Sequence, residues 1–378
     1  MVAVTDFIVV HPPTACSCCN RAILAQECTL SSLKRQVFDI PIPRLEVTEH
    51  RLSCFTCCGT THYGQFPEKV TANMQYGSKI LTLSTILSTD FRLPFRKISS
   101  LIQTLYGHKF NEATAMSANE QSFSALAPFE AYLKERILES EVVHFDETGL
   151  KVAGKRQWMH TAYTASFCFL FTHLGRGKKA LTDTMSVLKD YTNYAVHGCY
   201  ATYFTFKECK HAICNAHILR ELQALKEQNS VWAFTMHNFL MELYHQTDKG
   251  TKSIIDIEGK AIYRAKYVLI CQEAVKEEAA NNQTLDNATK TRGKTKQSKG
   301  RNLLDRLMKY QEAVLAFAFV EAVPFTNNIA EQAIRNVKIK QKVAIFRTQR
   351  EAQIYARNKG SSIQSKNTGR IFSKNYSK

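Results

Sequence analysis

The sequence predicts a mixed α/β fold with a small cysteine-rich segment ahead of it. After residue 140, short runs of aromatic and β-branched residues follow one another closely, as in the strands of a sheet. Longer segments before and after these runs place apolar residues three and four positions apart, as in helices that pack on a core. Strands that alternate with helices in this way indicate a mixed sheet flanked by helices.

Composition divides the chain into four regions. We expect a zinc-binding, ribbon-like domain, a helical linker or DNA-binding region, an α/β domain with a helical insertion, and a basic tail, at residues 1–66, 67–139, 140–346 (insertion at about 218–322) and 347–378. In the first region, 35–40 and 45–50 are predicted to be short strands. The polar stretch 275–301 is predicted to be a linker, and the chain from about Gly360 a loose tail.

The α/β domain can be assigned element by element. Strands are predicted at 141–145, 157–165, 167–173 and 194–200. A crossover helix at 177–191 is predicted between the third and fourth strands, and a long helical region at 215–247. A further helix is expected shortly after Pro324, where Pro and Asn residues mark its start.

Charge, apolar content and cysteine count limit the class of protein. Lys and Arg number 50 against 33 Asp and Glu, and a net charge of +17 predicts a polyanionic partner, nucleic acid first. The chain has no run of about 18 apolar residues and no signal-peptide pattern at its start, so we expect a cytoplasmic protein without a membrane partner. In a reducing cytoplasm the 12 cysteines are expected to be thiols or metal ligands.

Two CxxC motifs near the start predict a structural zinc site. Cys16 with Cys19, and Cys54 with Cys57, each place two thiolates where one ion can bind both, and two such pairs complete a tetrahedron. Adjacent thiols offer alternative ligands: Cys18 and Cys58. The competing interpretation is a set of free core cysteines, but two paired motifs favour Zn²⁺.

Two acidic residues far apart in the sequence are candidates for a second metal site. Asp146 ends an apolar strand, and Glu331 lies in the first turn of a later helix. Carboxylates brought together in this way can bind Mg²⁺, which prefers hard oxygen ligands. Each has a structural alternative, because Asp146 could cap a turn, and Asn328 with Glu331 has the spacing of a capping box.

The helix that contains Glu331 is predicted to carry a basic stripe. Steps of four, three and four positions from Glu331 lead along one face, and one further basic residue lies just beyond: Arg335, Lys338, Lys342 and Arg347. The opposite face can pack on a sheet through Ala330, Ile334 and Val337. An acid at the head of a basic stripe suits a DNA phosphate backbone held beside a metal ion.

Segments from the CxxC motifs nearly to the C-terminus together resemble the insertion-sequence-66 family of bacterial DDE transposases. The matching segments, in order, are "RQVFDIP", "YGSKI", "LPFRKI", "HFDETGLKV", "HGCYATYF", "CNAHILREL", "NLLDRL" and "VPFTNNIAEQAIRNVKIKQK". The resemblance implies an RNase H-like catalytic domain, a zinc-binding segment ahead of it, and Mg²⁺-dependent DNA cleavage and strand transfer at element ends. It also implies a nucleoid-associated protein that forms a homo-oligomer when element ends are paired.

Carried onto this sequence, the first catalytic acid of the family is Asp146 and the last is Glu331. The middle acid is absent, because the family has an Asp after the strand "AVH" and this sequence has Gly198. Asp190 is expected at the end of the preceding helix and cannot easily take the same place. Because misplacing a reacting group by about 1 Å can cost about 100-fold in rate, we expect severely impaired chemistry.

A Cys-x-x-His element after the middle position is the other candidate. By resemblance, His217 could contact the scissile phosphate or orient a water; alternatively it caps or packs at the start of its helix. His211, Cys214 and His217 also suggest Zn²⁺, although no fourth ligand is evident.

Two functional hypotheses follow. The first is a DNA transposase whose chemistry is impaired. The second is a non-catalytic zinc- and DNA-binding protein, a repressor or an inactive transposase remnant. The late start of the chain and one residue missing near "KVAIFRT" lead us to expect a truncated, degenerate copy.

Overall fold

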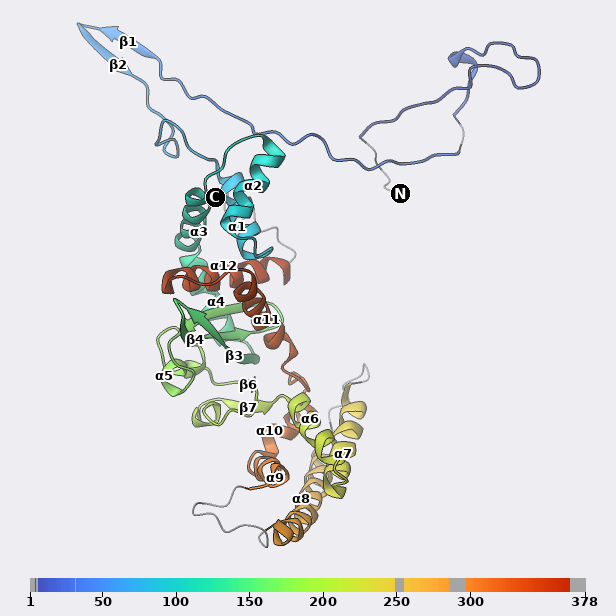
Figure 1. The fold of residues 1–378 in the computed structure, drawn as a ribbon, viewed down its shortest axis with the longest axis vertical. Helices are drawn as coiled ribbons and strands as arrows, with labels where there is room; N and C mark the ends of the chain where they lie inside the picture. The colour runs from blue at the N-terminus through green and yellow to red at the C-terminus, as the bar shows by residue number, and fades with distance from the viewer. Residues whose placement is uncertain (1–3, 5, 31, 249–254, 286–296, 368–378) are drawn as a thin grey trace. The chain divides into compact units, whose positions relative to one another are not determined.

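The computed structural model describes residues 4, 6–30, 32–248, 255–285 and 297–367. They belong to two compact units: Met1–Glu49 with Leu105–Gly107, and His50–Thr104 with His108–Lys378. The described residues contain a five-stranded mixed sheet and twelve α-helices (Figure 1). The predicted mixed α/β class is therefore confirmed.

Three antiparallel strands and two parallel strands make up the main sheet, in the order β5-β4-β3-β6-β7. The antiparallel strands are β3 (Val142–Val152), β4 (Lys155–Tyr163) and β5 (Cys168–His173). The strands that join in parallel are β6 (Tyr194–His197) and β7 (Lys210–Ile213). The four predicted strands are present as β3 to β6, and β7 is a short additional strand that sequence patterns did not predict. The first was predicted too short: β3 continues to Val152 because it pairs with β4 along this length, so Asp146 lies inside the strand and not at its end.

The crossover between β5 and β6 contains less helix than predicted. Within 177–191, only α5 (Lys178–Leu181) and a 3₁₀ turn (Leu188–Asp190) form. The Asp183 carboxylate accepts the Met185 backbone N–H at 2.8 Å, in a local turn that competes with helix. The prediction of one continuous helix is wrong for this reason.

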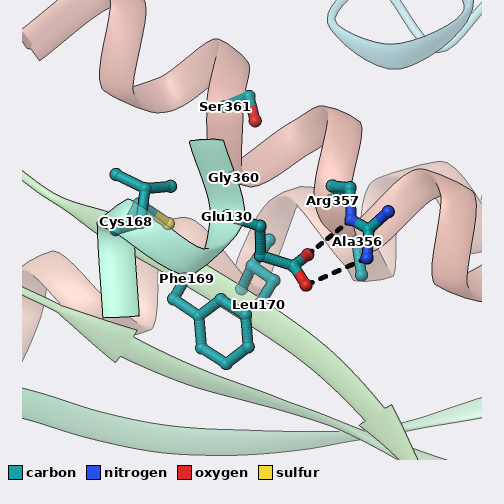
Figure 2. Close-up of a pocket in the computed structure, with 9 residues that line it drawn as sticks. Glu130, Cys168, Phe169, Leu170, Ala356, Arg357, Gly360 and Ser361 are labelled. Atoms are coloured by element: carbon teal, nitrogen blue, oxygen red, sulfur yellow. Dashed lines mark hydrogen bonds and ion pairs between the residues drawn. The ribbon is translucent and has the colours of Figure 1, made fainter. Parts of the chain in front are cut away.

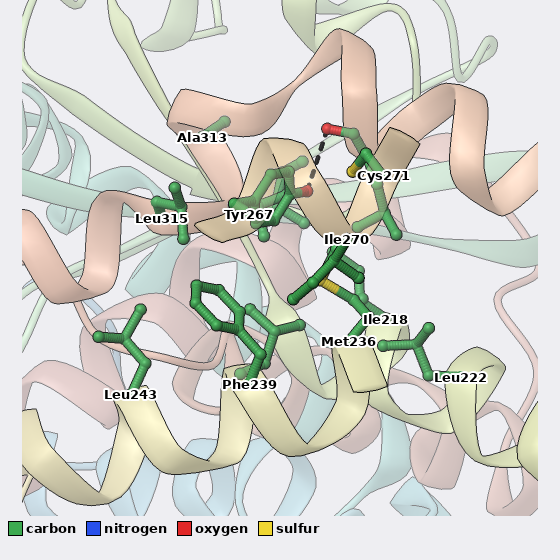
Figure 3. Close-up of a cluster of buried hydrophobic side chains, with 14 of the residues drawn as sticks. Ile218, Leu222, Met236, Phe239, Leu243, Tyr267, Ile270, Cys271, Ala313 and Leu315 are labelled. Carbon is green, nitrogen blue, oxygen red and sulfur yellow. Dashed lines mark hydrogen bonds between the residues drawn. The ribbon is translucent and has the colours of Figure 1, made fainter. Parts of the chain in front are cut away.

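Four helices precede the sheet, where the apolar spacing predicted helix: α1 (Ser78–Thr89), α2 (Phe95–Tyr106), α3 (Glu112–Ala125) and α4 (Ala127–Leu138). Five more lie between β7 and α11: α6 (Asn215–Lys226), α7 (Val231–Asp248), α8 (Ile257–Leu285), α9 (Lys299–Lys309) and α10 (Gln311–Phe319). These five share one apolar core, in which the Tyr267 hydroxyl donates to the Leu307 carbonyl at 3.1 Å (Figure 3). No helix among the described residues is both long and apolar enough to cross a membrane.

Helix α8 corrects the predicted linker. It continues to Leu285, so the linker predicted from residue 275 starts too early. Glu278 explains the extension, because this 4% exposed side chain accepts the Trp232 indole N–H at 3.0 Å and fixes α8 to α7. Residues 286–296 of the predicted linker lie outside the described residues, and its basic end is helical, because α9 begins at Lys299.

Two C-terminal helices pack on the sheet, α11 (Asn328–Val343) on β3 and β4, and α12 (Gln349–Asn367) on β5 (Figure 1). The predicted loose tail from about Gly360 is therefore wrong as far as residue 367. Gly360 approaches β5 so closely that a Cβ there would lie 3.0 Å from the Cys168 carbonyl oxygen. Lys359 forms a buried ion pair with Asp90 at 2.7 Å. Residues 368–378 lie outside the described part of the chain.

A small crevice lies where α12 meets α4 and β5 (Figure 2). The Arg357 guanidinium donates to both carboxylate oxygens of Glu130, at 2.8 and 3.0 Å. Neither Asp146 nor Glu331 lines this crevice. The crevice is therefore a packing feature that fastens α12 to α4.

The described residues near the N-terminus have little regular structure. An isolated antiparallel bridge joins Ala15 to Ala22 in the first unit. In the second unit, β1 (Cys54–Cys57) pairs with β2 (Thr60–Tyr63). The strands predicted at 35–40 and 45–50 do not form, and most of their residues are exposed. Strand propensity depends on packing against a neighbouring strand, so β-prone residues alone do not produce one.

Candidate active site

Three parallel strands bring three chain positions to one edge of the sheet. β3 pairs with β6, and β6 with β7, in parallel registers. Extended by one or two residues beyond the last pairs, these registers put Asp146 beside Gly198 and Gly198 beside Cys214. Since neighbouring strands are about 4.8 Å apart, the first and last positions of this row are roughly 10 Å apart.

Asp146 is a carboxyl group whose surroundings disfavour its charge. It is half-buried, and the Glu147 backbone N–H donates to its Oδ1 at 2.9 Å. Burial raises the pKa of Asp146 to about 7, with further contributions from the Glu147 and Glu331 carboxylates. A cation bound here would lower this pKa, because an opposite charge favours the ionised form.

Glu147 contacts a different set of residues. Successive side chains of a strand point to opposite faces, so Glu147 and Asp146 diverge. Arg176 donates to Glu147 Oε1 at 2.7 Å, and the Tyr203 hydroxyl donates to Oε2. Only 4% of the Glu147 side chain is exposed. Glu147 therefore joins β3 to the two segments that follow β5 and β6.

Asn327 ties the start of α11 to β3. Its side chain is buried, its Nδ2 donates to the Phe145 carbonyl at 2.8 Å, and its Oδ1 accepts from His144 Nδ1 at 2.8 Å. α11 begins at Asn328 without a side-chain cap, so the capping-box alternative for Glu331 does not form. The role of Asn327 could not be predicted from the sequence. An Asn just before a helix indicates an N-cap, and nothing in the local sequence indicates buried hydrogen bonds to a distant strand.

Cys214, His217 and Glu331 form a compact cluster at the end of β7. Cys214 is buried and is the N-cap residue of α6, and His217 lies in the first turn of that helix. Glu331 Oε1 lies 3.7 Å from Cys214 Sγ and 3.8 Å from His217 Nδ1. One possible ligand atom from each of the three lies within 4.8 Å of the other two. His217 therefore faces the acid at the start of α11.

Gly198 leaves the middle of the row without a side chain. A Cβ added there would meet no heavy atom within 4 Å, so a side chain can start at this position without a clash. Asp190 does not compensate, because it lies in the 3₁₀ turn before β6 with its side chain 61% exposed and 3.9 Å from the Lys189 ammonium.

A protein-family model matches most of the chain. Residues 73–354 match the model of the transposase IS66 family. The chain belongs to the IS66 family of transposases. The matched range includes the row at the strand ends and the cluster around Glu331, and it begins after the two CxxC motifs. No curated protein matches the chain significantly.

The basic residues predicted to contact DNA lie on or just beyond α11 of this IS66-family chain. All four are exposed: Arg335, Lys338, Lys342 and Arg347. The Lys338 ammonium donates to the Gly149 carbonyl, which places it against β3. The predicted apolar face is buried as expected, at Ala330, Ile334 and Val337. DNA contact along the exposed face stays a prediction.

The first CxxC motif forms a tight turn. The Cys19 and Cys18 backbone N–H groups donate to the Cys16 sulfur and lower the pKa of that thiol. The next residue, Asn20, has a φ of 58° and donates its N–H to the Cys16 carbonyl at 2.9 Å. N–H groups directed at a sulfur favour the thiolate, the form that binds metals.

The second CxxC motif lies in a hairpin. Cys54 and Cys57 are three residues apart in β1, so their side chains project from opposite faces of the strand. Cys58 and Gly59 have φ values of 51° and 75° and form the turn into β2. Zinc binding by the two motifs together stays a prediction.

The strand ends suit a hard divalent cation only in part. Asp146 and Glu331 supply carboxylate oxygens, and the pKa of Asp146 is raised by burial and by the neighbouring carboxylates, more than the Arg176 charge lowers it. The middle strand supplies no ligand, because Gly198 stands there. Two residues beside Glu331 are softer donors that sequence patterns only hinted at, Cys214 and His217. The contact between residues 214 and 331 has no signal in local sequence.

Proposed function

We propose that this IS66-family chain is a DNA transposase, acting at insertion-element ends by metal-dependent cleavage and strand transfer, whose chemistry is impaired. One observation supports the impairment above all. The register of β3 and β6 puts Gly198 beside Asp146, at the position where the family has its middle acid. A site with two of three carboxylates binds and orients its metal poorly, and errors of about 1 Å already cost about 100-fold.

In this proposal Asp146 and Glu331 are the ligands of Mg²⁺. Mg²⁺, when bound, activates a water or a 3′-hydroxyl and stabilises the leaving oxygen of the phosphodiester. Asp146 must give up its proton for this role, so binding is favoured above the pKa of about 7 that burial imposes. Asn327 holds the start of α11 against β3 and so keeps Glu331 in position. His217 is near enough to Glu331 to orient a water or contact a phosphate oxygen.

Further parts of the proposal extend the family assignment. Antiparallel β3–β4–β5 hairpins joined in parallel by β6 and β7 support an RNase H-like catalytic domain. The turn around Cys16 supports structural Zn²⁺ bound by Cys16, Cys19, Cys54 and Cys57. The net charge of +17 supports DNA as the partner, and pairing of two element ends requires a homo-oligomer.

The second candidate is a non-catalytic zinc- and DNA-binding protein, which represses or competes with an active transposase. Gly198 favours it, because DNA contact and zinc binding do not need the middle acid. It predicts the same DNA affinity and no cleavage with any metal.

The test is a strand-cleavage assay with Mg²⁺ or Mn²⁺. Its substrate is DNA from the two ends of the insertion element, which flank the gene for this chain. We expect Gly198→Asp to cleave at least about 100-fold faster than the unmodified chain. The matched control is Gly77→Asp, because Gly77 is another glycine with open space around its Cβ position. This control makes the same change in charge and should not restore cleavage.

The outcomes separate the candidates. Equal cleavage by the unmodified chain and Gly198→Asp would show that the middle acid is dispensable and that the proposed impairment is wrong. Tight DNA binding without cleavage by either protein would favour the non-catalytic candidate.

A further inference from the structure

We infer that Cys214, His217 and Glu331 form a binding site for a zinc-class divalent cation, separate from the CxxC motifs. This site does not depend on DNA cleavage. It also gives Glu331 a second role, in which the expected Mg²⁺ ligand is shared with two softer donors. The inference rests on the positions of the three side chains and on the chemistry of their donor atoms.

The separations between donor atoms suit one small ion. Cys214 Sγ and His217 Nδ1 lie 3.7 and 3.8 Å from the same oxygen, Glu331 Oε1. In a tetrahedral zinc site with Zn–S of about 2.3 Å and Zn–O of about 2.0 Å, a sulfur and an oxygen ligand are about 3.5 Å apart. A nitrogen and an oxygen ligand are about 3.3 Å apart. The two distances to Glu331 Oε1 are therefore within about half an ångström of these values, and all three donor atoms lie within 4.8 Å of one another.

Two helix N-termini fix the three residues. Cys214 and His217 come from the cap and first turn of α6, and Glu331 from the first turn of α11. Both starts are joined through Asn327, whose backbone N–H donates to Cys214 Sγ at 3.2 Å. Burial raises the pKa of the Cys214 thiol, and this backbone N–H directed at the sulfur opposes part of that effect. The site is therefore formed by the fold before any ion binds.

The donor set selects the class of metal. Thiolate and imidazole are soft or borderline ligands that suit Zn²⁺, whereas Mg²⁺ prefers an octahedron of oxygens. Three protein ligands leave one position of a zinc tetrahedron for a water or another small ligand. His217 and Glu331 keep 46% and 22% of their side chains exposed, so an ion can reach them from solvent.

The row at the strand ends explains why Glu331 can belong to this site. Cys214 ends β7 beside Gly198, and Asp146 lies one strand further away. With no carboxylate at Gly198 to share a metal between Asp146 and Glu331, the nearest donors to Glu331 are Cys214 and His217. Zn²⁺ at this cluster and Mg²⁺ at Asp146 therefore compete for Glu331.

The test measures zinc bound at equilibrium by the full chain, dialysed against chelator-buffered Zn²⁺, for the unmodified protein and for His217→Ala and Glu331→Gln. We expect each variant to bind about one Zn²⁺ fewer per chain. Zinc held by the CxxC motifs is common to all three proteins and cancels in the difference. Substitution of Zn²⁺ by Co²⁺ should give a thiolate-to-metal absorption band that Cys214→Ser reduces.

A matched control uses another buried cysteine. Cys271 is a buried cysteine of the helical insertion and does not belong to the Cys214–His217–Glu331 cluster, so Cys271→Ser should leave both the zinc count and the Co²⁺ band unchanged. The inference is overturned if His217→Ala and Glu331→Gln bind as much Zn²⁺ as the unmodified chain. His217 is half-exposed, so His217→Ala tests the site even if Cys214→Ser is unstable.

Discussion

Strands β3 and β6 run side by side in parallel, yet they carry very different residues at neighbouring positions. β3, which continues to Val152, carries Asp146, a carboxyl whose surroundings raise its pKa to about 7. The chain leaves β6 at Gly198, where a Cβ would meet open space. β3 thus places a carboxyl group where its charged form is disfavoured, and the neighbouring position after β6 has no side chain.

This difference shows that the backbone arrangement of a site can form without the side chains that would supply its chemistry. The edge at β6 is fixed by backbone pairing, including the Cys214 N–H that donates to the His197 carbonyl at 2.9 Å. No side chain at Gly198 takes part in that pairing. A glycine at this position therefore has no cost in backbone pairing, and the proposed absence of the middle acid is compatible with an intact sheet.

The largest effect expected is the loss, when Asp146 is also replaced, of the cleavage rate that Gly198→Asp gains. Combining Gly198→Asp with Asp146→Asn should abolish the gain of at least about 100-fold, because a middle acid needs a partner to hold the metal. The measurement is the single-turnover cleavage rate of the double variant against that of Gly198→Asp. Survival of the gain in the double variant would show that Asp146 is not the partner.

Next in size is the loss of stability when the tie between α11 and β3 is cut. Asn327→Ala removes one buried hydrogen bond to the Phe145 carbonyl and one to His144, and should lower the free energy of unfolding by about 2–3 kcal/mol. Urea denaturation measures it. Asn328→Ala is the matched control at an exposed position and should change stability by less than about 0.5 kcal/mol. Equal effects of the two would contradict the role of Asn327.

A smaller effect is the loss of folding stability that comes from ionising the Asp146 carboxyl inside the protein. Between pH 3.8 and about 7 the carboxyl ionises in the unfolded chain and stays protonated in the fold, so stability falls as the pH rises through this range. Asp146→Asn removes this cost. We expect it to be more stable than the unmodified chain by on the order of 1–2 kcal/mol at pH 8, and equally stable near pH 3.5. A pH-independent difference in thermal denaturation would argue against a raised pKa.

The smallest effect expected is on DNA affinity. Arg335→Ala and Lys342→Ala should each weaken binding by a few-fold and reduce the slope of log affinity against log salt by about 0.9 for each phosphate that the removed side chain neutralises. Fluorescence anisotropy over a range of salt concentrations measures both. Lys276→Ala, on α8 of the insertion, is the control. An equal weakening with Lys276→Ala would mean that DNA does not lie along α11.

Residues close together in sequence were predictable, and residues joined by the fold were not. The strands β3 to β6 and the helices around them follow from apolar spacing. Asp146 could be named as the acid after an apolar run, although β3 continues past it to Val152. The short strand β7 was missed because four residues carry too little pattern. The helix predicted at 177–191 failed because a side-chain turn at Asp183 competes locally, and α12 persists past Gly360 because it packs on β5.

The site divides in the same way. Glu331 and His217 could be named from the sequence, since each starts a helix and matches a family motif. Their contact with each other and with Cys214 could not, because 117 residues separate Cys214 from Glu331. Asn327 was missed for the same reason, since its partners belong to β3.

The most direct test of the comparison between β3 and β6 is the affinity of the chain for Mn²⁺, a spectroscopic substitute for Mg²⁺, before and after Gly198→Asp. Electron paramagnetic resonance counts free Mn²⁺, and the buffer contains no Zn²⁺, because Zn²⁺ at Cys214 and His217 would compete for Glu331. We expect Gly198→Asp to bind Mn²⁺ at least about tenfold more tightly, and Gly198→Asp with Asp146→Asn to lose that gain. Equal affinity of the unmodified chain and Gly198→Asp would contradict the claim that Asp146 is an intact ligand in a site that lacks its neighbour.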